Sequence, residues 1–221
     1  MLEAVHAKRE IAIQLSLPMV RSTLNGSKSV TRRTVKGEIP NGAVRAVFNP
    51  YSETKRPAWR WIDAADRVLG KPFRCPYGMA GDLLWGREAW RTLWQHDELP
   101  PRDVPPGAPI WYYADGEAHD GGVAGKFRQG MFMPRWASRI LLEVVDVRVE
   151  RLQDITSTEA IAEGIERVGN RWRHYFFPND DSEAWEFSVN SYASLWDKLN
   201  GEGAWESNPW VFCIAFRRIS P

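Results

Sequence analysis

The stretch Asn25-Gly26-Ser27-Lys28-Ser29-Val30-Thr31-Arg32-Arg33 follows a short apolar segment, residues 17–20, that is typical of the first turn of a helix. Pro18 suits the first turn of that helix, where its missing N–H costs nothing, and Gly26 can end the helix in a left-handed conformation. A strand over residues 28–33 would alternate faces, whereas a turn would place Lys28 and Thr31 on one side. Lys28 and Arg33 are two cations close to the Thr31 hydroxyl and to the turn at Gly26. Such a group can bind a phosphate, a carboxylate or a polar base edge. A solvated basic loop is the alternative.

The composition is that of an ordinary globular protein. The 221 residues, with 43% hydrophobic and 26% charged residues, predict one domain over residues 1–221. The net charge of +1 is unevenly distributed. Residues 1–60 hold eleven Lys and Arg against four Asp and Glu, and residues 141–206 hold six against fourteen. The basic N-terminal part favours an anionic partner.

Metal, disulfide and membrane signals are absent from the sequence. Cys75 and Cys213 are too few for a disulfide scaffold, and their apolar neighbours predict buried thiols. The four histidines show no paired ligand spacing, so we expect no metal and no cofactor. No stretch approaches the roughly 20 apolar residues of a membrane helix, and no secretory signal is evident. We therefore expect a cytoplasmic protein that does not enter a membrane.

The apolar patterns predict a mixed α+β fold, a small β-barrel with flanking helices and long loops. In the clearest strand, residues 140–152, Leu141, Val145, Val147 and Val149 are predicted to share one face. Residues 37–60 are predicted to cross the surface, and residues 95–109 to form an irregular surface excursion. The expected elements are strands at residues 11–15, 83–90, 110–114, 140–152 and 210–216, and helices at residues 17–25, 156–164 and 182–200.

Several charged and aromatic residues interrupt apolar segments and are candidates for a site. Arg87 and Glu88 lie in an apolar strand, so each must reach a cavity or form an ion pair. Arg135 and Trp136 come just before the long strand and can line a cleft. Trp59 lies in the run Arg56, Trp59, Arg60, Trp61, which can stack on bases, although packing in the core is at least as consistent with it.

A carboxylate is expected at the end of the helix at residues 156–164. Thr156 and Glu159 form a predicted capping box at its start. Glu163 falls in its last turn, where it opposes the helix dipole at a cost of up to about 1 kcal/mol. With Lys28 and Thr31 it makes a set that can attack an amide, because a lysine of lowered pKa can take the proton of a threonine hydroxyl.

The motif Gly26-x-Lys28-x-x-Thr31-x-Arg33 resembles the signature of the ASCH group of PUA-like β-barrels. The likeness extends over most of the chain, to a branch often found in phages and prophages. It rests on Gly81-Asp82-Leu83-Leu84-Trp85-Gly86-Arg87-Glu88, Met133-Pro134-Arg135-Trp136-Ala137-Ser138-Arg139, Leu152-x-x-Ile155, Glu163-Gly164 and Asn208-Pro209-Trp210-Val211.

The resemblance implies a cleft between the barrel and a helix, used to recognise RNA or a nucleobase. Some small members are amidohydrolases that remove the acyl group from N4-acetylcytidine with a lysine, a threonine and a glutamate. Lys28, Thr31 and Glu163 match these positions, and Arg33 matches the arginine that follows. This chain is about twice as long, and we expect insertions at residues 37–75 and 94–130.

Two functional hypotheses follow. In the first, which we favour, Thr31 is the nucleophile, Lys28 its base and Glu163 the group that orients Lys28, without a metal. Lys28→Ala and Thr31→Ala should then abolish turnover and leave the melting temperature near wild type. The residues predicted to contact the nucleobase or a nucleic acid are Asn25, Arg32, Arg33, Arg87, Glu88, Arg135 and Trp136.

The second hypothesis is a binding module without catalysis. Lys28, Arg32 and Arg33 would then hold phosphates of single-stranded nucleic acid, RNA rather than DNA, and Trp59 or Trp136 would stack on bases. A phage protein whose surface only docks a host partner is a third possibility, but no feature of the sequence points to it.

Overall fold

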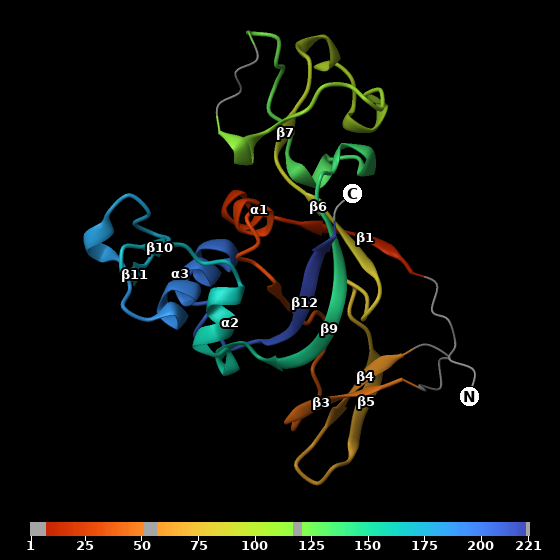
Figure 1. Ribbon diagram of the computed structural model, residues 1–221. Helices are drawn as coiled ribbons and strands as arrows, with labels where there is room; N and C mark the ends of the chain where they lie inside the picture. The colour runs from red at the N-terminus through yellow and green to blue at the C-terminus, as the bar shows by residue number, and fades with distance from the viewer. Residues whose placement is uncertain (1–7, 51–56, 117–120, 220–221) are drawn as a thin grey trace.

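A five-stranded sheet forms the centre of the computed structural model, which describes residues 8–50, 57–116 and 121–219 (Figure 1). Its strand order is β1-β6-β9-β12-β2, in which β1 and β6 are parallel and the other pairs are antiparallel. The fold is therefore mixed α+β and rich in sheet, as the sequence predicts. The strands of this sheet are β1 Glu10–Gln14, β2 Val30–Thr34, β6 Leu83–Arg87, β9 Leu141–Arg151 and β12 Trp210–Ile219.

The remaining elements are short and surround this sheet. The α-helices are α1 Leu17–Leu24, α2 Ser157–Ala162 and α3 Ser188–Asn200. The other strands are β3 Arg45–Asn49, β4 Ala58–Ile62, β5 Val68–Phe73, β7 Trp90–Arg91, β8 Trp111–Tyr112, β10 Arg167–Val168 and β11 Arg171–Trp172. The 3-10 helices are η1 Trp94–His96, η2 Pro101–Asp103, η3 Tyr113–Asp115, η4 Gly130–Phe132, η5 Arg135–Ala137, η6 Leu152–Asp154 and η7 Asp181–Glu183.

A side-chain hydrogen bond connects the two edge strands of the central sheet, β1 and β2. Arg33 in β2 donates from Nη2 to the carbonyl of Gln14 at the end of β1, over 2.7 Å. In the described part of the chain the two strands do not pair through their backbones, so the sheet order is open. The contact nevertheless brings the end of β1 beside β2, which is where the predicted site residues begin.

A β-bulge changes which residues of β9 face the core. The register against β12 shifts between Ala215 and Phe216, and Val145 has no partner there. Leu142 and Val144 are therefore buried, at 0% and 1% exposure, whereas Val145 is 53% exposed. The prediction that Leu141 and Val145 share one face with Val147 and Val149 was wrong, because one extra residue in a strand reverses its alternation, and of these four only Val147 and Val149 pack against the core.

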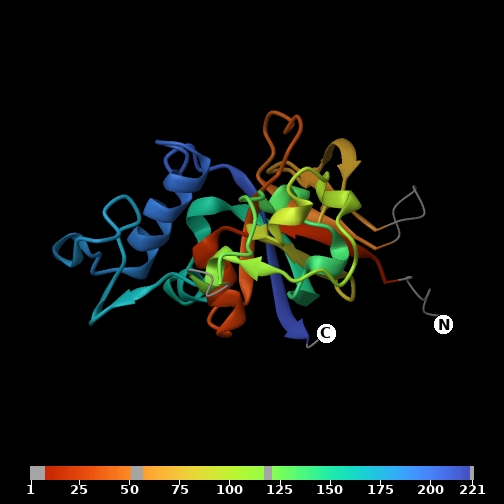
Figure 2. The ribbon, with the colours of Figure 1, turned by 90° about the horizontal axis from the view of Figure 1, so that it is seen from above.

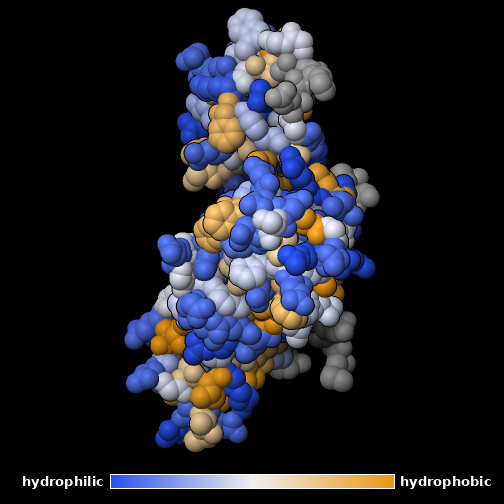
Figure 3. All heavy atoms as spheres, turned by 90° about the vertical axis from the view of Figure 1, so that its left-hand side faces the viewer, coloured by the Kyte–Doolittle hydropathy of each residue, from blue (hydrophilic) through white to orange (hydrophobic). Residues whose placement is uncertain are grey.

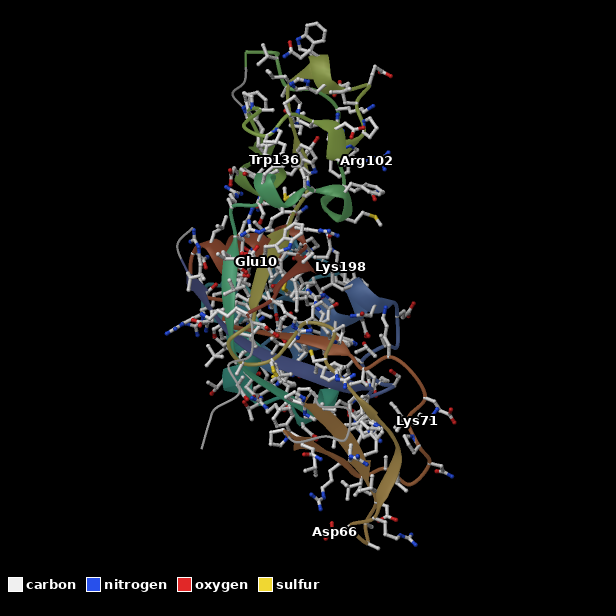
Figure 4. The ribbon with its side chains drawn as sticks, turned by 90° about the vertical axis from the view of Figure 1, so that its right-hand side faces the viewer. Glu10, Asp66, Lys71, Arg102, Trp136 and Lys198 are labelled. Carbon is white, nitrogen blue, oxygen red and sulfur yellow. The ribbon has the colours of Figure 1, made fainter. Side chains whose placement is uncertain are left out.

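The region predicted to cross the surface at residues 37–60 contributes to a second sheet. β3, β4 and β5 form an antiparallel sheet; Asp66 lies at its far end and Lys71 lies within β5 (Figure 4). Trp59 and Trp61 are only 4% and 3% exposed, and Trp59 contacts Phe212 of β12 with ring centroids 5.8 Å apart. Trp59 is thus a core residue and cannot stack on a base. Arg56 lies outside the described residues.

The segment between β6 and β9 forms a separate lobe, drawn at the top of Figure 1. It is built on the β7–β8 pair and short 3-10 helices, and it has its own small core of Trp90, Val104, Met133 and Ala137. Val104 is 1% exposed, so the proline-rich stretch that was predicted to lie outside any core does contribute to one. The predicted strand at residues 83–90 also ends earlier, at Arg87.

The predicted capping box is present, but one helix is shorter than predicted. The capping box of α2 is present, with the Glu159 backbone N–H donating to the Thr156 hydroxyl. α3 begins at Ser188, later than predicted, because residues 181–183 form a separate 3-10 turn. Seen from above, α3 and the β10–β11 hairpin lie together at one side of the molecule (Figure 2). Within the described residues, no helix combines the length and the apolar character that a membrane span requires.

Both cysteines are buried free thiols, as predicted. Burial raises the pKa of Cys75 and of Cys213 to about 12.

Candidate functional site

A pocket of about 290 Å³ lies where β1, α1, β2 and α3 meet. This volume is near the lower end of the range for small-molecule sites. Apolar side chains from α1 and α3 and polar side chains from the strands share its wall. The residues that line it are Gln14, Leu15, Ser16, Met19, Thr31, Arg32, Arg33, Thr34, Glu163, Tyr192, Leu195, Trp196, Leu199 and Asn200.

Lys28 lies behind this wall and has no exposed side-chain surface. Its Nζ donates to the carbonyls of Val30 (2.8 Å) and Glu163 (2.7 Å) and to Oε2 of Glu163 (2.7 Å). The three protons of the ammonium group are therefore all engaged, and none goes to Thr31. Burial lowers the pKa of Lys28, and the Glu163 carboxylate opposes part of that effect.

The end of α2 positions Glu163 against Lys28. Glu163 is the C-cap of the helix, and the next residue, Gly164, has φ +83°. A Cβ at Gly164 would lie 2.4 Å from the Ser22 hydroxyl and 2.8 Å from the Lys28 Cβ. Glycine is therefore required for α2 to approach α1 and Lys28 this closely. The Lys28 ammonium faces the carboxylate that the helix dipole disfavours, which offsets that cost.

Arg32 joins the same buried network from β2. Its guanidinium donates to Glu150 (2.7 Å), Glu159 (3.0 Å) and Glu163 (3.4 Å), and its side chain has no exposed surface. The Tyr192 hydroxyl donates to the same Glu163 oxygen, Oε1, over 3.2 Å. Burial raises the pKa of Tyr192 well above its usual value, so this phenol is a proton donor.

The burial of Lys28 and Arg32 corrects one prediction. Both cations are enclosed and paired with carboxylates, so neither can contact a phosphate of a nucleic acid. Among Lys28, Arg32 and Arg33, Arg33 is the one that lines the pocket and has no carboxylate partner in the described part of the chain.

Glu150, Glu159 and Cys213 have ligand atoms within 4.8 Å of one another, which is close enough to hold a cation. Arg32 and Arg148 occupy both carboxylates, however: Arg148 donates to Glu150 over 2.8 Å and also to Glu159. A metal ion would have to displace two guanidinium groups and deprotonate a thiol whose pKa is raised. The cluster therefore functions as an ion-pair network that holds β2, β9 and α2 together.

Three polar groups in the pocket wall have no hydrogen-bond partner among the described residues. The Thr31 side chain lines the pocket, and its hydroxyl forms no hydrogen bond with any described residue. Arg33 also lines the pocket, and its Nε is buried with no hydrogen-bond partner in the described structure. The Ser16 hydroxyl, at the N-cap of α1, is buried and unpaired in the same way. Buried polar groups are normally paired, so the buried Arg33 Nε and Ser16 hydroxyl favour a polar ligand in this pocket, and the Thr31 hydroxyl is free to contact it.

The remaining predicted site residues lie elsewhere. Asn25 caps α1, and its Oδ1 accepts from the Ser27 backbone N–H (2.9 Å) and hydroxyl (2.7 Å), which stabilises the turn before Lys28. The guanidinium groups of Arg87 and Arg135 both lie over the ring of Trp85, at 4.7 and 5.9 Å from its centroid. None of these residues lines the pocket.

Glu88 forms a structural ion pair at the base of the lobe. It is 1% exposed, and Arg139 donates to both of its oxygens (2.9 and 3.0 Å). Because Glu88 begins the lobe and Arg139 ends it, the pair closes the lobe at its attachment to the sheet. Trp136 is half-buried against the core of the lobe, and Figure 4 shows it well above Lys198 on α3.

Comparison of the chain with protein-family models, with curated proteins and with solved structures gave no match. The resemblance to the ASCH group therefore stays a prediction.

The sequence pattern missed several residues of the pocket. Tyr192 lies in the core as one of the apolar residues of α3, but its hydroxyl also reaches Glu163. Gln14 ends β1, Ser16 follows it at the N-cap of α1, and Asn200 ends α3. Only their position in the sequence could have indicated them. Each is a polar residue at the end of an element that packs near residues 25–33.

Proposed function

We propose that this chain is an ASCH-type protein with a PUA-like barrel that binds a cytosine-type nucleobase and hydrolyses an N4-acyl amide. One observation carries the proposal. The same pocket wall contains a hydroxyl that forms no hydrogen bond, that of Thr31, and a guanidinium nitrogen without a partner, Arg33 Nε. The Lys28–Glu163 pair lies directly behind them. A pocket of about 290 Å³ suits a single acylated base.

Each group has a defined role in the proposed reaction. The Thr31 oxygen attacks the acyl carbonyl carbon while its proton passes to neutral Lys28, and Arg33 Nε donates to the developing oxyanion. The C–N bond then breaks, and the exocyclic nitrogen leaves with the proton that Lys28 held. Water hydrolyses the threonine ester by the same proton transfers in reverse, and the carboxylic acid is released.

This reaction requires a change at Lys28. Its Nζ must lose a proton and release one acceptor, and the carbonyl of Val30 is the natural one because it immediately precedes Thr31 in the chain. Glu163 would hold Nζ in place through its carboxylate and its carbonyl during this exchange. The lowered pKa of Lys28 makes the neutral amine more accessible than that of an exposed lysine.

The direct test is turnover of N4-acetylcytidine. We expect the purified protein to release cytidine and acetate in equal amounts, followed by chromatography, with the reaction unaffected by a metal chelator. Longer acyl groups on the same base would define the capacity of the pocket. The absence of cytidine with every acyl chain tried would reject the enzymatic proposal.

The pH dependence of turnover provides a second prediction. Neutral Lys28 is the reactive form, so the rate should rise with pH and then level off. Because burial lowers the pKa of Lys28, the midpoint of this rise should lie below the ordinary lysine value of 10.5. Initial rates from pH 6 to 10, corrected for hydrolysis without protein, would measure it. A rate that is flat over this range, or that falls with pH, would contradict the role of Lys28 as base.

A binding module without catalysis is the alternative, and one observation favours it. The lobe exposes aromatic side chains, with Trp94 63% and Phe127 53% exposed, where single-stranded nucleic acid can stack. These residues replace Trp59, which is buried. The alternative predicts no turnover, together with an affinity for single-stranded RNA that falls steeply with salt.

A further inference from the structure

A second pocket lies on the side of α3 that faces away from the sheet. Its volume is about 370 Å³, and aromatic rings and carboxylates dominate its wall. Figure 3 shows this side of the molecule, where apolar residues form separate patches in a hydrophilic surface. Its aromatic and acidic lining residues are His174, Phe176, Trp185, Asp197, Trp205 and Glu206.

Contacts within the protein position part of the aromatic wall. Trp185 forms an isolated bridge with Trp172 through two backbone hydrogen bonds, of 2.6 and 2.7 Å. His174 stacks on the Trp185 ring, with centroids 4.9 Å apart and planes inclined by 17°. On the opposite side, the Trp205 backbone N–H donates to Asp197 over 2.7 Å. These contacts hold the Trp185 and His174 rings and anchor the backbone of Trp205, which lowers the entropic cost of binding.

The two carboxylates of this pocket carry uncompensated charge. Neither Asp197 nor Glu206 forms an ion pair with another residue of the described structure. Asp197 uses one oxygen, Oδ1, for Trp205, and its second oxygen has no partner there. Glu163, Glu88 and Glu143, by contrast, are all paired with basic side chains. The Lys and Arg residues of the described chain contribute nothing to the wall of this pocket.

We propose that this pocket binds an alkyl cation, of which the arginine side chain is the best-fitting example. A guanidinium group would pair with Asp197 and Glu206 and would lie against the face of Trp185 or Trp205. Aromatic faces and carboxylates together attract organic cations, and a planar guanidinium matches a carboxylate in two hydrogen bonds. Its alkyl stem would cover the exposed Phe176. The site is independent of the pocket that contains Thr31.

The test compares an arginine ligand with its neutral isostere. The probes are Nα-acetyl-arginine methylamide and Nα-acetyl-citrulline methylamide, titrated while the indole N–H signals are followed by two-dimensional NMR. Trp185→Phe and Trp205→Phe would assign two of those signals. We expect the arginine compound to shift both signals and the citrulline compound to leave them unchanged.

Charge-removing variants test the same proposal. Glu206→Gln and Asp197→Asn should each weaken binding by about fivefold or more, because each removes one partner of the cation. Glu186→Gln is the matched control, since Glu186 is an exposed acid of the neighbouring loop that does not line the pocket. Equal binding of the citrulline compound, or unchanged affinity in both pocket variants, would overturn the proposal.

A third arm identifies the source of the cation. An arginine-containing peptide with a flexible glycine flank would be titrated beside the single-residue compound. Tighter binding of the peptide would assign the pocket to a partner polypeptide, and equal binding would assign it to a free small cation. Each of these results supports a cation site.

Discussion

Replacing Lys28 with methionine is expected to lower the free energy of unfolding by about 3–5 kcal/mol, because it leaves a buried carboxylate without its main partner. Lys28 and Glu163 are almost fully enclosed, and their charged atoms lie 2.7 Å apart. The substitution also frees the carbonyls of Val30 and Glu163, which are then buried without that donor. For a chain of this size, the change corresponds to a fall in melting temperature of roughly 6–20 °C.

This expectation replaces the one drawn from the sequence, in which loss of Lys28 leaves the melting temperature near wild type. Lys36→Met is the matched control, because Lys36 is exposed just beyond β2 and its replacement should change stability by no more than about 0.5 kcal/mol. Thermal unfolding followed by circular dichroism would compare the two variants. Similar melting temperatures for Lys28→Met and Lys36→Met would contradict the buried ion pair.

A double-mutant cycle separates the ion pair from the cost of burial. Glu163→Gln removes the negative charge and retains a carbonyl acceptor for Tyr192 and Arg32. Combined with Lys28→Met, it should cost less than the sum of the two single variants, because the double variant leaves neither partner as an isolated charge. Additive losses would show that Lys28 and Glu163 do not interact as described.

Local patterns predicted the elements of the fold better than their arrangement. The helix start at Thr156 and the left-handed residue at Gly26 depend on neighbouring residues alone, and both are present. The exposure of Val145 depends on a bulge against β12, which is more than sixty residues away in the chain. The burial of Trp59 likewise depends on its contact with Phe212. A single sequence carries no direct sign of such distant pairs.

The candidate site shows the same limit. Lys28, Thr31 and Glu163 were grouped from their chemistry, and the structure places them at one corner, where β2 meets the end of α2. Which of them is accessible could not be inferred, because accessibility depends on how Arg32, Glu150 and Glu159 fill the space behind the pocket. Arg87, Glu88, Arg135 and Trp136 were selected as charged or aromatic residues in apolar segments. In the structure these four residues contact other residues of the protein and do not line the pocket.

Thr31→Val is expected to reduce turnover of N4-acetylcytidine on the order of 10³-fold or more while leaving the melting temperature close to wild type. Valine has nearly the shape of threonine and fits the same strand position. The Thr31 hydroxyl forms no hydrogen bond with the described residues, so its loss breaks none of those that hold the fold together. Stability and activity therefore separate at this residue, which they do not at Lys28.

Thr34→Val is the control, because Thr34 lies in the same strand and also lines the pocket, but is more exposed. Its turnover should stay within about threefold of wild type, because a residue that only lines a pocket contributes little to the transition state. Initial rates at saturating and limiting substrate would separate loss of binding from loss of chemistry. A Thr31→Val protein that keeps the wild-type rate at saturating substrate would exclude Thr31 as nucleophile and would leave it a contact of the bound base.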